Sequence, residues 1–465
     1  MPVVPVLLIA VLSILLTTDA VATNRSEAAE TWYQAGAAYV DQRERQTRGK
    51  RRAKNVILFI GDGMSLTTVT AARILEGQMK DEPGEENLLS FETFPATAFS
   101  KTYAVDRQVT DSASTATAMV TGVKTRFRVI SMDETAGTDD TCEAGKLTTI
   151  LEEAEMRGLA TGVVSTARLT HATPASLYAH VIERSMEREG KRGCADVASQ
   201  LIDFPYGDGL EVALGGGYPM FAASMRPDGR DLVAEWATRD GAAVVRTADE
   251  LASLAPETRQ VLGLFGNSHM DYEIDRTSEQ PSLTAMTEAA IERVAGHRKG
   301  YFLMIESGRI DHGHHATNAK RALTETIEFS NAIRRASELV DDDTLIIVTA
   351  DHGHTLAMAG YPGRGNPILG IAGDDEHDHP YTTLSYANGP GYRAPASLES
   401  PRPDLTDVDT AADDYLQEAT VPLAMETHGG ADVPVYATGP GSQWVSGVME
   451  QNVIYHVMRR ALFGR

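Results

Sequence analysis

Several short apolar runs, each about as long as a buried strand, most constrain how this chain can fold. A strand covered on both faces needs an unbroken apolar sequence rather than an alternating one. Such runs occupy residues 55–60, 160–165, 301–305, 345–349 and 433–437. Helical patterns separate them, at residues 68–76, 147–157, 282–295 and 319–339. This alternation predicts an α/β fold with a large doubly wound, mostly parallel sheet flanked by helices.

One long stretch interrupts this pattern. Residues 363–420 contain many Gly, Pro and Asp residues and show little periodicity. Because the stretch is too long for an ordinary loop, we expect an inserted subdomain or a mobile excursion there. His377 and His379 lie among its aspartates. A solvated acidic loop and a dedicated cation site are the two interpretations of that segment.

The N-terminus begins with an apolar run of about 16 residues, shorter than the roughly 20 that a membrane span needs. Ala20-Val-Ala22 offers a small-x-small cleavage site, which predicts a signal peptide over residues 1–22 and export to the periplasm or the extracellular space. No Lys or Arg precedes the apolar run, so an uncleaved membrane anchor is the alternative. Residues 23–50 are polar and predict a helical arm ahead of one large domain at 51–465. The chain ends without an apolar tail, so no lipid-anchor signal is expected there.

The charge balance is strongly acidic. The chain has 65 acidic and 42 basic side chains, a formal net charge of −23. We therefore expect no nucleic acid partner, because no basic stripe is present to release counterions. An anionic substrate would have to be met by metal ions or by a few arginines.

Two cysteines, Cys142 and Cys194, are present. In an exported protein such a pair can form one disulfide, and two unrelated thiols are the alternative. The sequence has no CxxC motif, so a cysteine-based metal site is not expected.

Acidic residues follow three of the predicted strands: Asp62, Glu306 and Asp351. Sites in open α/β sheets form outside the carboxyl ends of the strands. Carboxylates that converge there repel one another unless cations neutralise them, which favours metal ions. A helix N-cap could explain Asp62 or Asp351 singly, but not the histidines nearby.

Histidines accompany these acids. His352 follows Asp351 directly, and His428 precedes the last predicted strand. Asp311 and His315 are four residues apart, so on a helix they face the same way. Carboxylate and imidazole together suit zinc, whereas a polar loop with a surface histidine cluster is the alternative.

Ser112 is the candidate nucleophile. Small residues with good helix propensity follow it, so we expect Ser112 to open a helix. Backbone N–H groups at a helix N-terminus favour anions such as an alkoxide or a phosphate. The alternative is that Asp111 or Ser112 only caps the helix. Because no G-x-S-x-G motif is present, metal activation of Ser112 is the better interpretation.

Six segments together resemble the alkaline phosphatase family, from about residue 55 to the C-terminus. They are Asn55-Val-Ile-Leu-Phe-Ile-Gly-Asp-Gly-Met64, Thr110-Asp-Ser-Ala-Ser-Thr-Ala-Thr-Ala118, Thr170-His-Ala-Thr-Pro174, Gly308-Arg-Ile-Asp-His-Gly-His-His315, Thr349-Ala-Asp-His352 and Glu426-Thr-His428. Residues 270–274 and 321–326 resemble the animal-like branch.

The resemblance implies two Zn²⁺ and one Mg²⁺ per subunit. The first zinc would be held by Asp311, His315 and His428. The second would be held by Asp62, Asp351 and His352, with deprotonated Ser112 as a further ligand. Magnesium would be held by Asp62, Glu306 and Thr173, with His171 behind it. Around the phosphate, Arg184 would bind two oxygens and His312 would line the site near the first zinc.

The resemblance also implies the reaction: hydrolysis of phosphate monoesters to an alcohol and inorganic phosphate, through a phosphoserine at Ser112. It implies a homodimer in which the arm at 23–50 reaches across, a disulfide between Cys142 and Cys194, and a crown-like insert at 363–420. Gly266 and Gln280 stand where the animal branch has acidic calcium ligands, so no fourth metal is expected.

Two other functions are compatible with parts of the pattern. One is a phosphodiesterase of the same superfamily, and the other is a non-catalytic zinc-binding surface protein. Ser112, Arg184 and a complete ligand set together favour the phosphomonoesterase.

Overall fold

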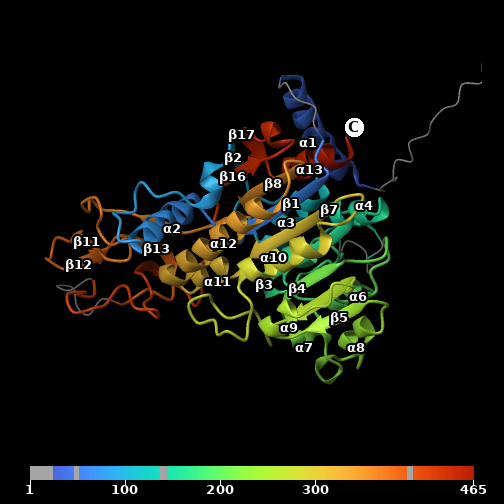
Figure 1. Cartoon of the computed structure of the whole chain (residues 1–465). Helices are drawn as coiled ribbons and strands as arrows, with labels where there is room; N and C mark the ends of the chain where they lie inside the picture. Colours follow the sequence, from blue (N-terminus) through green and yellow to red (C-terminus); the bar gives the residue numbers. More distant parts are fainter. Residues whose placement is uncertain (1–24, 47–51, 137–141, 143, 395–401, 465) are drawn as a thin grey trace, which may run out of the picture.

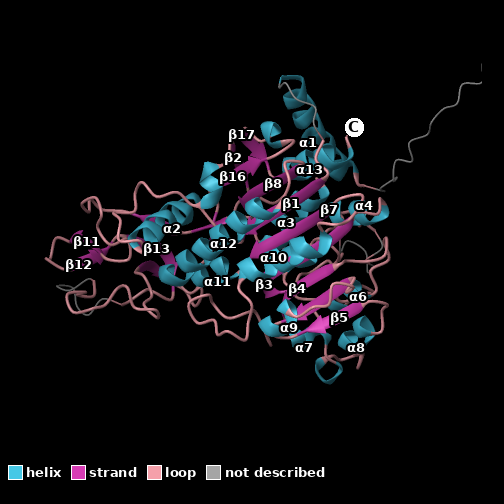
Figure 2. Ribbon diagram, viewed as in Figure 1, coloured by secondary structure: helices cyan, strands magenta, loops and turns pink. Residues whose placement is uncertain are grey.

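The computed structural model describes residues 25–46, 52–136, 142, 144–394 and 402–464. Its centre is a ten-stranded sheet with the order β17-β2-β16-β8-β1-β7-β3-β4-β6-β5 (Figure 2). The strands are β1 (Asn55–Gly61), β2 (Ala96–Lys101), β3 (Ala160–Arg168), β4 (Val212–Gly216), β5 (Ala242–Val245), β6 (Gln260–Leu264), β7 (Tyr301–Ser307), β8 (Thr344–Ala350), β16 (Val433–Thr438) and β17 (Gly447–Glu450).

The prediction of a mostly parallel sheet is confirmed. Every pairing from β8 across to β5 is parallel, while β16 runs antiparallel to both β8 and β2. All five apolar runs form strands of this sheet. Their apolar character reflects burial and carries no information on direction, so the reversal of β16 could not be predicted.

Burial on both faces explains the unbroken apolar sequence of β1. Successive side chains of a strand point to opposite faces. Val56, Leu58 and Ile60 accordingly pack in one hydrophobic layer, and Ile57 and Phe59 pack in the other. All five are fully buried.

Helices cover both faces of the sheet (Figure 1). The layer that contains Phe59 includes residues of α2 (Leu66–Gln78), α10 (Leu283–Val294) and α12 (Ala319–Leu339). The opposite layer includes residues of α3 (Ser112–Thr121), α4 (Ile150–Met156), α6 (Val197–Ile202), α8 (Leu232–Ala237) and α13 (Val453–Phe463). The four predicted helices are therefore α2, α4, α10 and α12. Helix α4 begins later than predicted because Thr149 and Glu152 form a capping box at its start.

A 20-residue helix, α1 (Glu27–Gln46), forms the arm and lies beside α13 of the same chain (Figure 1). Arg460 on α13 pairs with Asp41 at 2.5 Å and with Glu44 at 2.8 Å. Asn452 Nδ2 donates to the carbonyl of Trp32 at 2.8 Å. The predicted signal peptide at residues 1–22 lies outside the described residues.

The stretch at 363–420 forms small β elements at the end of the molecule away from β4 and β5 (Figure 1). They are the hairpin of β11 (Ile371–Asp374) and β12 (Pro380–Thr382), together with β13 (Leu384–Gly389) and β14 (Ala419–Pro422). Strand β10 (Leu356–Met358), which precedes the stretch, pairs with β13 to complete a three-stranded sheet. In the acidic loop, Asp375 accepts from the backbone N–H of His377 at 2.8 Å and pairs with Arg402 at 2.7 Å. Within the described residues, neither His377 nor His379 joins a group that could hold a metal ion.

The shorter helices and strands are α5 (Ala172–Ala175), α7 (Tyr218–Phe221), α9 (Ala248–Ala252), α11 (Arg309–His315), β9 (Gly353–His354) and β15 (His428–Gly429). Three 3₁₀ helices complete the described chain: η1 (Ser90–Thr93), η2 (Ala223–Met225) and η3 (Ser442–Trp444). Cys142 and Cys194 form a disulfide with their Cα atoms 5.0 Å apart. Among the described helices, none combines the length and the apolar character that a membrane crossing requires.

Candidate metal centre and active site

Three adjacent parallel strands bring three carboxylates to one edge of the sheet. Asp351 follows β8, Asp62 follows β1, and Glu306 lies near the end of β7. All three are fully buried. The convergence predicted from the apolar runs is therefore present, because parallel neighbours place their carboxyl ends together.

The electrostatics of this edge favour cations. Burial raises the pKa of Asp62 well above its usual value, and Asp351, Asp311 and Glu306 raise it further by repulsion. Burial also raises the pKa of Glu306 to about 7. Charged carboxylates so placed are stable only with a compensating positive charge, and metal ions of the expected kind would supply it.

Asp62, Asp351 and His352 form one candidate metal group. His352 Nε2 lies 3.4 Å from Asp62 Oδ1 and 3.3 Å from Asp351 Oδ2. Burial lowers the pKa of His352 well below its usual value, so its imidazole is neutral and can offer a lone pair. The backbone N–H of Gly63 donates to Asp351 Oδ1 at 3.0 Å and fixes that carboxylate.

Asp311, His315 and His428 form a second candidate group. Helix α11 places Asp311 and His315 one turn apart, as predicted, with His315 Nε2 3.3 Å from Asp311 Oδ1. His428 arrives on β15, and its Nε2 lies 3.3 Å from Asp311 Oδ1 and 3.2 Å from His315 Nε2. The Nδ1 of His428 contacts the carbonyl of Thr110 at 2.7 Å, so Nδ1 carries the proton and the Nε2 lone pair faces the group.

A third group lies beside Asp62. Ligand atoms of Asp62, His171 and Glu306 lie within 4.8 Å of one another. Thr173 on α5 is close enough to lower the pKa of Glu306, yet Thr173 Oγ1 and Glu306 Oε1 are buried without a hydrogen bond of normal geometry. Hard oxygen atoms that lack partners fit the magnesium ion that the sequence resemblance implies.

Ser112 is the first residue of α3 and is 1% exposed. The capping role belongs to Asp111, whose side chain accepts from the N–H of Ser114. Ser112 Oγ instead lies 3.2 Å from His352 Nε2 and 3.4 Å from Asp62 Oδ1. The serine therefore opens a helix, as predicted, and faces the metal-binding edge.

Arg184 is positioned by two polar partners. Its Nη1 donates to Asp111 Oδ2 at 2.9 Å, and its Nη2 lies 3.0 Å from His171 Nε2. Each terminal nitrogen of a guanidinium carries two N–H groups, so one remains on each for a further acceptor. Asp111 thus couples Ser112, its neighbour in sequence, to the arginine expected to bind phosphate.

His312 lies with His171 and with His269, a residue that sequence reasoning missed. The rings of His269 and His312 are 4.0 Å apart, and those of His171 and His312 are 5.6 Å apart. His269 Nε2 accepts from Arg168 Nη1 at 2.6 Å, and His171 Nε2 faces Arg184. The guanidinium groups of Arg168 and Arg184 contact ring nitrogens of His269 and His171, so these nitrogens are not available to a metal ion. The three imidazoles therefore do not offer a complete metal ligand set.

His354 is a second residue that the sequence analysis missed. Its Nε2 lies 2.9 Å from Asp311 Oδ1, and its Nδ1 lies 2.5 Å from Glu426 Oε2. The sequence feature that could have identified His354 is its position two residues after His352. His314, by contrast, points away from Asp311, toward Thr68 Oγ1 at 3.0 Å and the Tyr386 hydroxyl at 2.8 Å.

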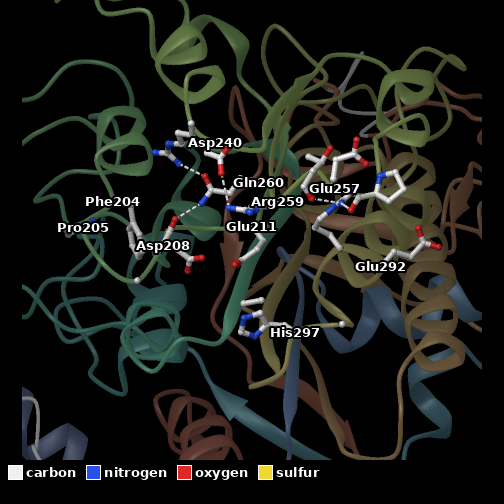
Figure 3. A pocket seen from close by; sticks show the side chains of 18 residues that line it. Phe204, Pro205, Asp208, Glu211, Asp240, Glu257, Arg259, Gln260, Glu292 and His297 are labelled. Carbon is white, nitrogen blue, oxygen red and sulfur yellow. Dashed lines mark hydrogen bonds and ion pairs between the residues drawn. The ribbon is translucent and has the colours of Figure 1, made fainter.

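A separate hollow of about 790 Å³ lies at the opposite edge of the sheet, where β3, β4, β5 and β6 begin. Figure 3 shows Asp208, Glu211, Gln260 and His297 among the side chains around it. Within the described residues, its lining contributes to none of the groups that could hold a metal ion. The hollow is therefore separate from the candidate metal centre.

Known proteins resemble this chain over most of its length. A sequence profile of the alkaline phosphatase family matches residues 53–463. An alkaline phosphatase of Gadus morhua is 40% identical over 449 residues, covering 90% of this chain and 93% of that protein. The tissue-nonspecific isozyme of Gallus gallus is 41% identical over 483 residues, covering 96% and 92%.

Solved structures extend the comparison to the fold. The alkaline phosphatase of Thermus thermophilus superposes with a TM-score of 0.67 at 26% identity, covering 90% of this chain and 95% of that one. The alkaline phosphatase of the Antarctic bacterium TAB5 gives a TM-score of 0.65 at 24% identity, covering 89% and 99%.

Proposed function

The chain belongs to the alkaline phosphatase family of phosphomonoester hydrolases, and from that premise we propose that it acts through a phosphoserine at Ser112 with two zinc ions and one magnesium ion. The position of Ser112 Oγ carries this proposal. It lies 3.2 Å from His352 Nε2 and 3.4 Å from Asp62 Oδ1, at the N-terminus of α3. A nucleophile there adjoins both a metal ligand set and a helix end that favours negative charge.

In this proposal each zinc ion has its own set of ligands, with more histidines around the first zinc and more carboxylates around the second. Asp311, His315 and His428 would hold the first zinc, and Asp62, Asp351 and His352 the second. Asp62, Glu306 and Thr173 would hold magnesium, with His171 behind it. When bound, these ions supply positive charge to the attacking and leaving oxygens of an in-line displacement.

The side chains around the ions position the nucleophile and orient the phosphate group. Ser112 Oγ bonds to phosphorus as the alcohol leaves, and water then cleaves the Ser112 phosphoester to release inorganic phosphate. Arg184 keeps one free N–H on each terminal nitrogen, so it can hold two phosphate oxygens at once. Asp111 fixes Arg184 at 2.9 Å, which presets the guanidinium before substrate arrives. His171 lies beside Arg184, and His312 lies beside His171.

The test is hydrolysis of p-nitrophenyl phosphate, measured before and after chelation and after zinc and magnesium are returned together. We expect Ser112→Ala to lose more than about 10³-fold in kcat. Its metal content should stay the same, because Asp62, Asp351 and His352 remain to hold the second zinc without Ser112. Acid quenching of the wild type with labelled phosphate should leave label on the peptide that contains Ser112. Unchanged turnover in Ser112→Ala would refute the nucleophile assignment. A higher rate on bis-p-nitrophenyl phosphate than on the monoester would instead favour a phosphodiesterase.

We also propose that the protein is exported and forms a homodimer. The apolar N-terminal run with Ala20-Val-Ala22 supports export, and mass spectrometry of the mature protein would locate the cleavage. Light scattering before and after removal of α1 would show whether the arm contributes to the dimer.

A further inference from the structure

Glu426 lies beside the second candidate group, that of Asp311, His315 and His428. It is 1% exposed and lies two residues before His428, yet it has no role in the proposed ligand sets. We propose that Glu426 is a positioning residue: its carboxylate aligns His354 against Asp311, and its main-chain carbonyl orients the ring of His315. This inference rests on the proposed function, because Asp311 and His315 are proposed zinc ligands.

His354 bridges two carboxylates. Its Nδ1 lies 2.5 Å from Glu426 Oε2 and its Nε2 lies 2.9 Å from Asp311 Oδ1. Carboxylate oxygens only accept hydrogen bonds, so both ring nitrogens of His354 donate. The Glu426 carboxylate therefore sets the ring angle at which Nε2–H holds Asp311. The side chain of His354 has no solvent exposure, so water offers no replacement for this contact.

The carboxylate of Glu426 is itself held firmly. Its Oε1 accepts from the backbone N–H of Thr355 at 2.7 Å and from Thr355 Oγ1 at 2.6 Å. Its Oε2 is engaged by His354. Although Glu426, His315 and His354 lie close enough to form a cation site, both oxygens of Glu426 are already used. The geometry therefore favours positioning over direct metal binding.

The main chain of Glu426 acts on His315. His315 Nδ1 lies 2.5 Å from the carbonyl oxygen of Glu426, and the N–H of Glu426 donates to the carbonyl of His315 at 2.9 Å. A proton on Nδ1 leaves the lone pair of His315 on Nε2, which faces Asp311 at 3.3 Å. Glu426 thus orients two histidines that contact Asp311, through chemically distinct atoms.

Glu426→Gln tests only the contact between the Glu426 carboxylate and His354, because the substitution keeps the main-chain carbonyl that contacts His315. The glutamine keeps the size and one oxygen for Thr355, but its amide nitrogen donates and cannot accept from His354 Nδ1. Removal of such an outer partner typically weakens metal binding by 10- to 100-fold. We expect zinc competition with a chelator to show this loss at one of two zinc sites, with the other zinc and the magnesium retained. In the cobalt-substituted protein, the absorption of one cobalt site should change.

Glu152→Gln is the matched control. Glu152 is also buried, and its Oε1 lies 2.7 Å from His180 Nε2, away from the metal groups. The control removes the same kind of Glu–His contact, so it should lower thermal stability without changing zinc affinity. Equal zinc loss in Glu426→Gln and Glu152→Gln would overturn the proposal, because general destabilisation would then explain both.

A double-mutant cycle separates positioning from folding. His354→Ala should weaken the same zinc site, and adding Glu426→Gln to it should cause little further loss, because the carboxylate acts through His354. Additive losses would overturn the proposal, as would wild-type zinc affinity in Glu426→Gln. A wild-type protein that binds no zinc would overturn the proposed function itself, which keeps the two failures distinct.

Discussion

The carboxyl group of Glu155 provides a quantitative test of burial away from the metal centre. Glu155 lies on α4 and is 1% exposed. Its Oε1 accepts from Thr161 Oγ1 at 2.5 Å, whereas its Oε2 is buried without a hydrogen-bond partner. Burial, aided by repulsion from the carboxylates of Glu211 and Asp208, raises the pKa of Glu155 from 4.5 to about 9.

The sign of the effect on stability follows from proton binding. The folded state holds the Glu155 proton more tightly than the unfolded chain does. Folding stability from this group is therefore greatest below pH 4.5, falls as the pH rises, and levels off above about pH 9. One pKa unit corresponds to about 1.4 kcal/mol, so the expected loss between about pH 6.5 and pH 8.5 is ~3 kcal/mol.

Glu155→Gln removes this titration and keeps the acceptor for Thr161. Urea unfolding of the wild type and the variant should be measured at both pH values. The wild type should lose ~3 kcal/mol more free energy of unfolding than Glu155→Gln over this interval, because all other titrations are shared. Glu292→Gln, an exposed change on α10, is the control and should follow the wild type. Parallel pH profiles for the wild type and Glu155→Gln would refute the reasoning.

Three further changes have direct outcomes. Arg184→Lys should raise KM for p-nitrophenyl phosphate by at least about tenfold, since lysine cannot hold two phosphate oxygens in a fork; an unchanged KM and kcat would exclude phosphate binding by Arg184. Replacing Cys142 and Cys194 together by serine opens a loop that spans 52 residues. The free energy of unfolding in urea titrations should fall by about 4 kcal/mol, because the unfolded chain gains conformational freedom. Wild-type protein with its disulfide reduced should match the variant. Phe329→Ala should cost about 3–5 kcal/mol in the same assay, because its buried ring packs 5.9 Å from that of Phe59; a loss below about 1 kcal/mol would contradict the packing argument.

Local sequence was sufficient for the central strands but not for the edges of the sheet. Buried strands such as β1, β7 and β8 have seven residues each, and their continuous apolar sequence is distinctive. Strands β4, β5 and β6 have only four or five residues, and β2 alternates in burial. Patterns that short resemble loops or helix ends, so the sequence did not predict them.

The candidate ligands were predicted more completely than their surroundings. Asp62, Glu306 and Asp351 stand at the ends of apolar runs, and Asp311 and His315 lie within one helical turn, where spacing alone brings side chains to one face. His428 and Thr173 have no such spacing and were expected as ligands only from the family resemblance. His354 and Glu426 have no such local signal. They meet because β9 and β15 pair antiparallel, with His354 opposite His428.

The sequence by itself therefore determined the strands of the core, the carboxylates at their ends, the helix that opens at Ser112 and the family to which they belong. Tertiary structure alone decided that Asp111, the neighbour of Ser112, pairs with Arg184. It also brought guanidinium groups to ring nitrogens of His171 and His269. The contacts by which Glu426 orients His315 and His354 likewise depend on it. The physical reason is the range of the forces. Burial and helical periodicity act between neighbours in sequence, whereas hydrogen-bond partners are chosen by distances that only the folded chain defines.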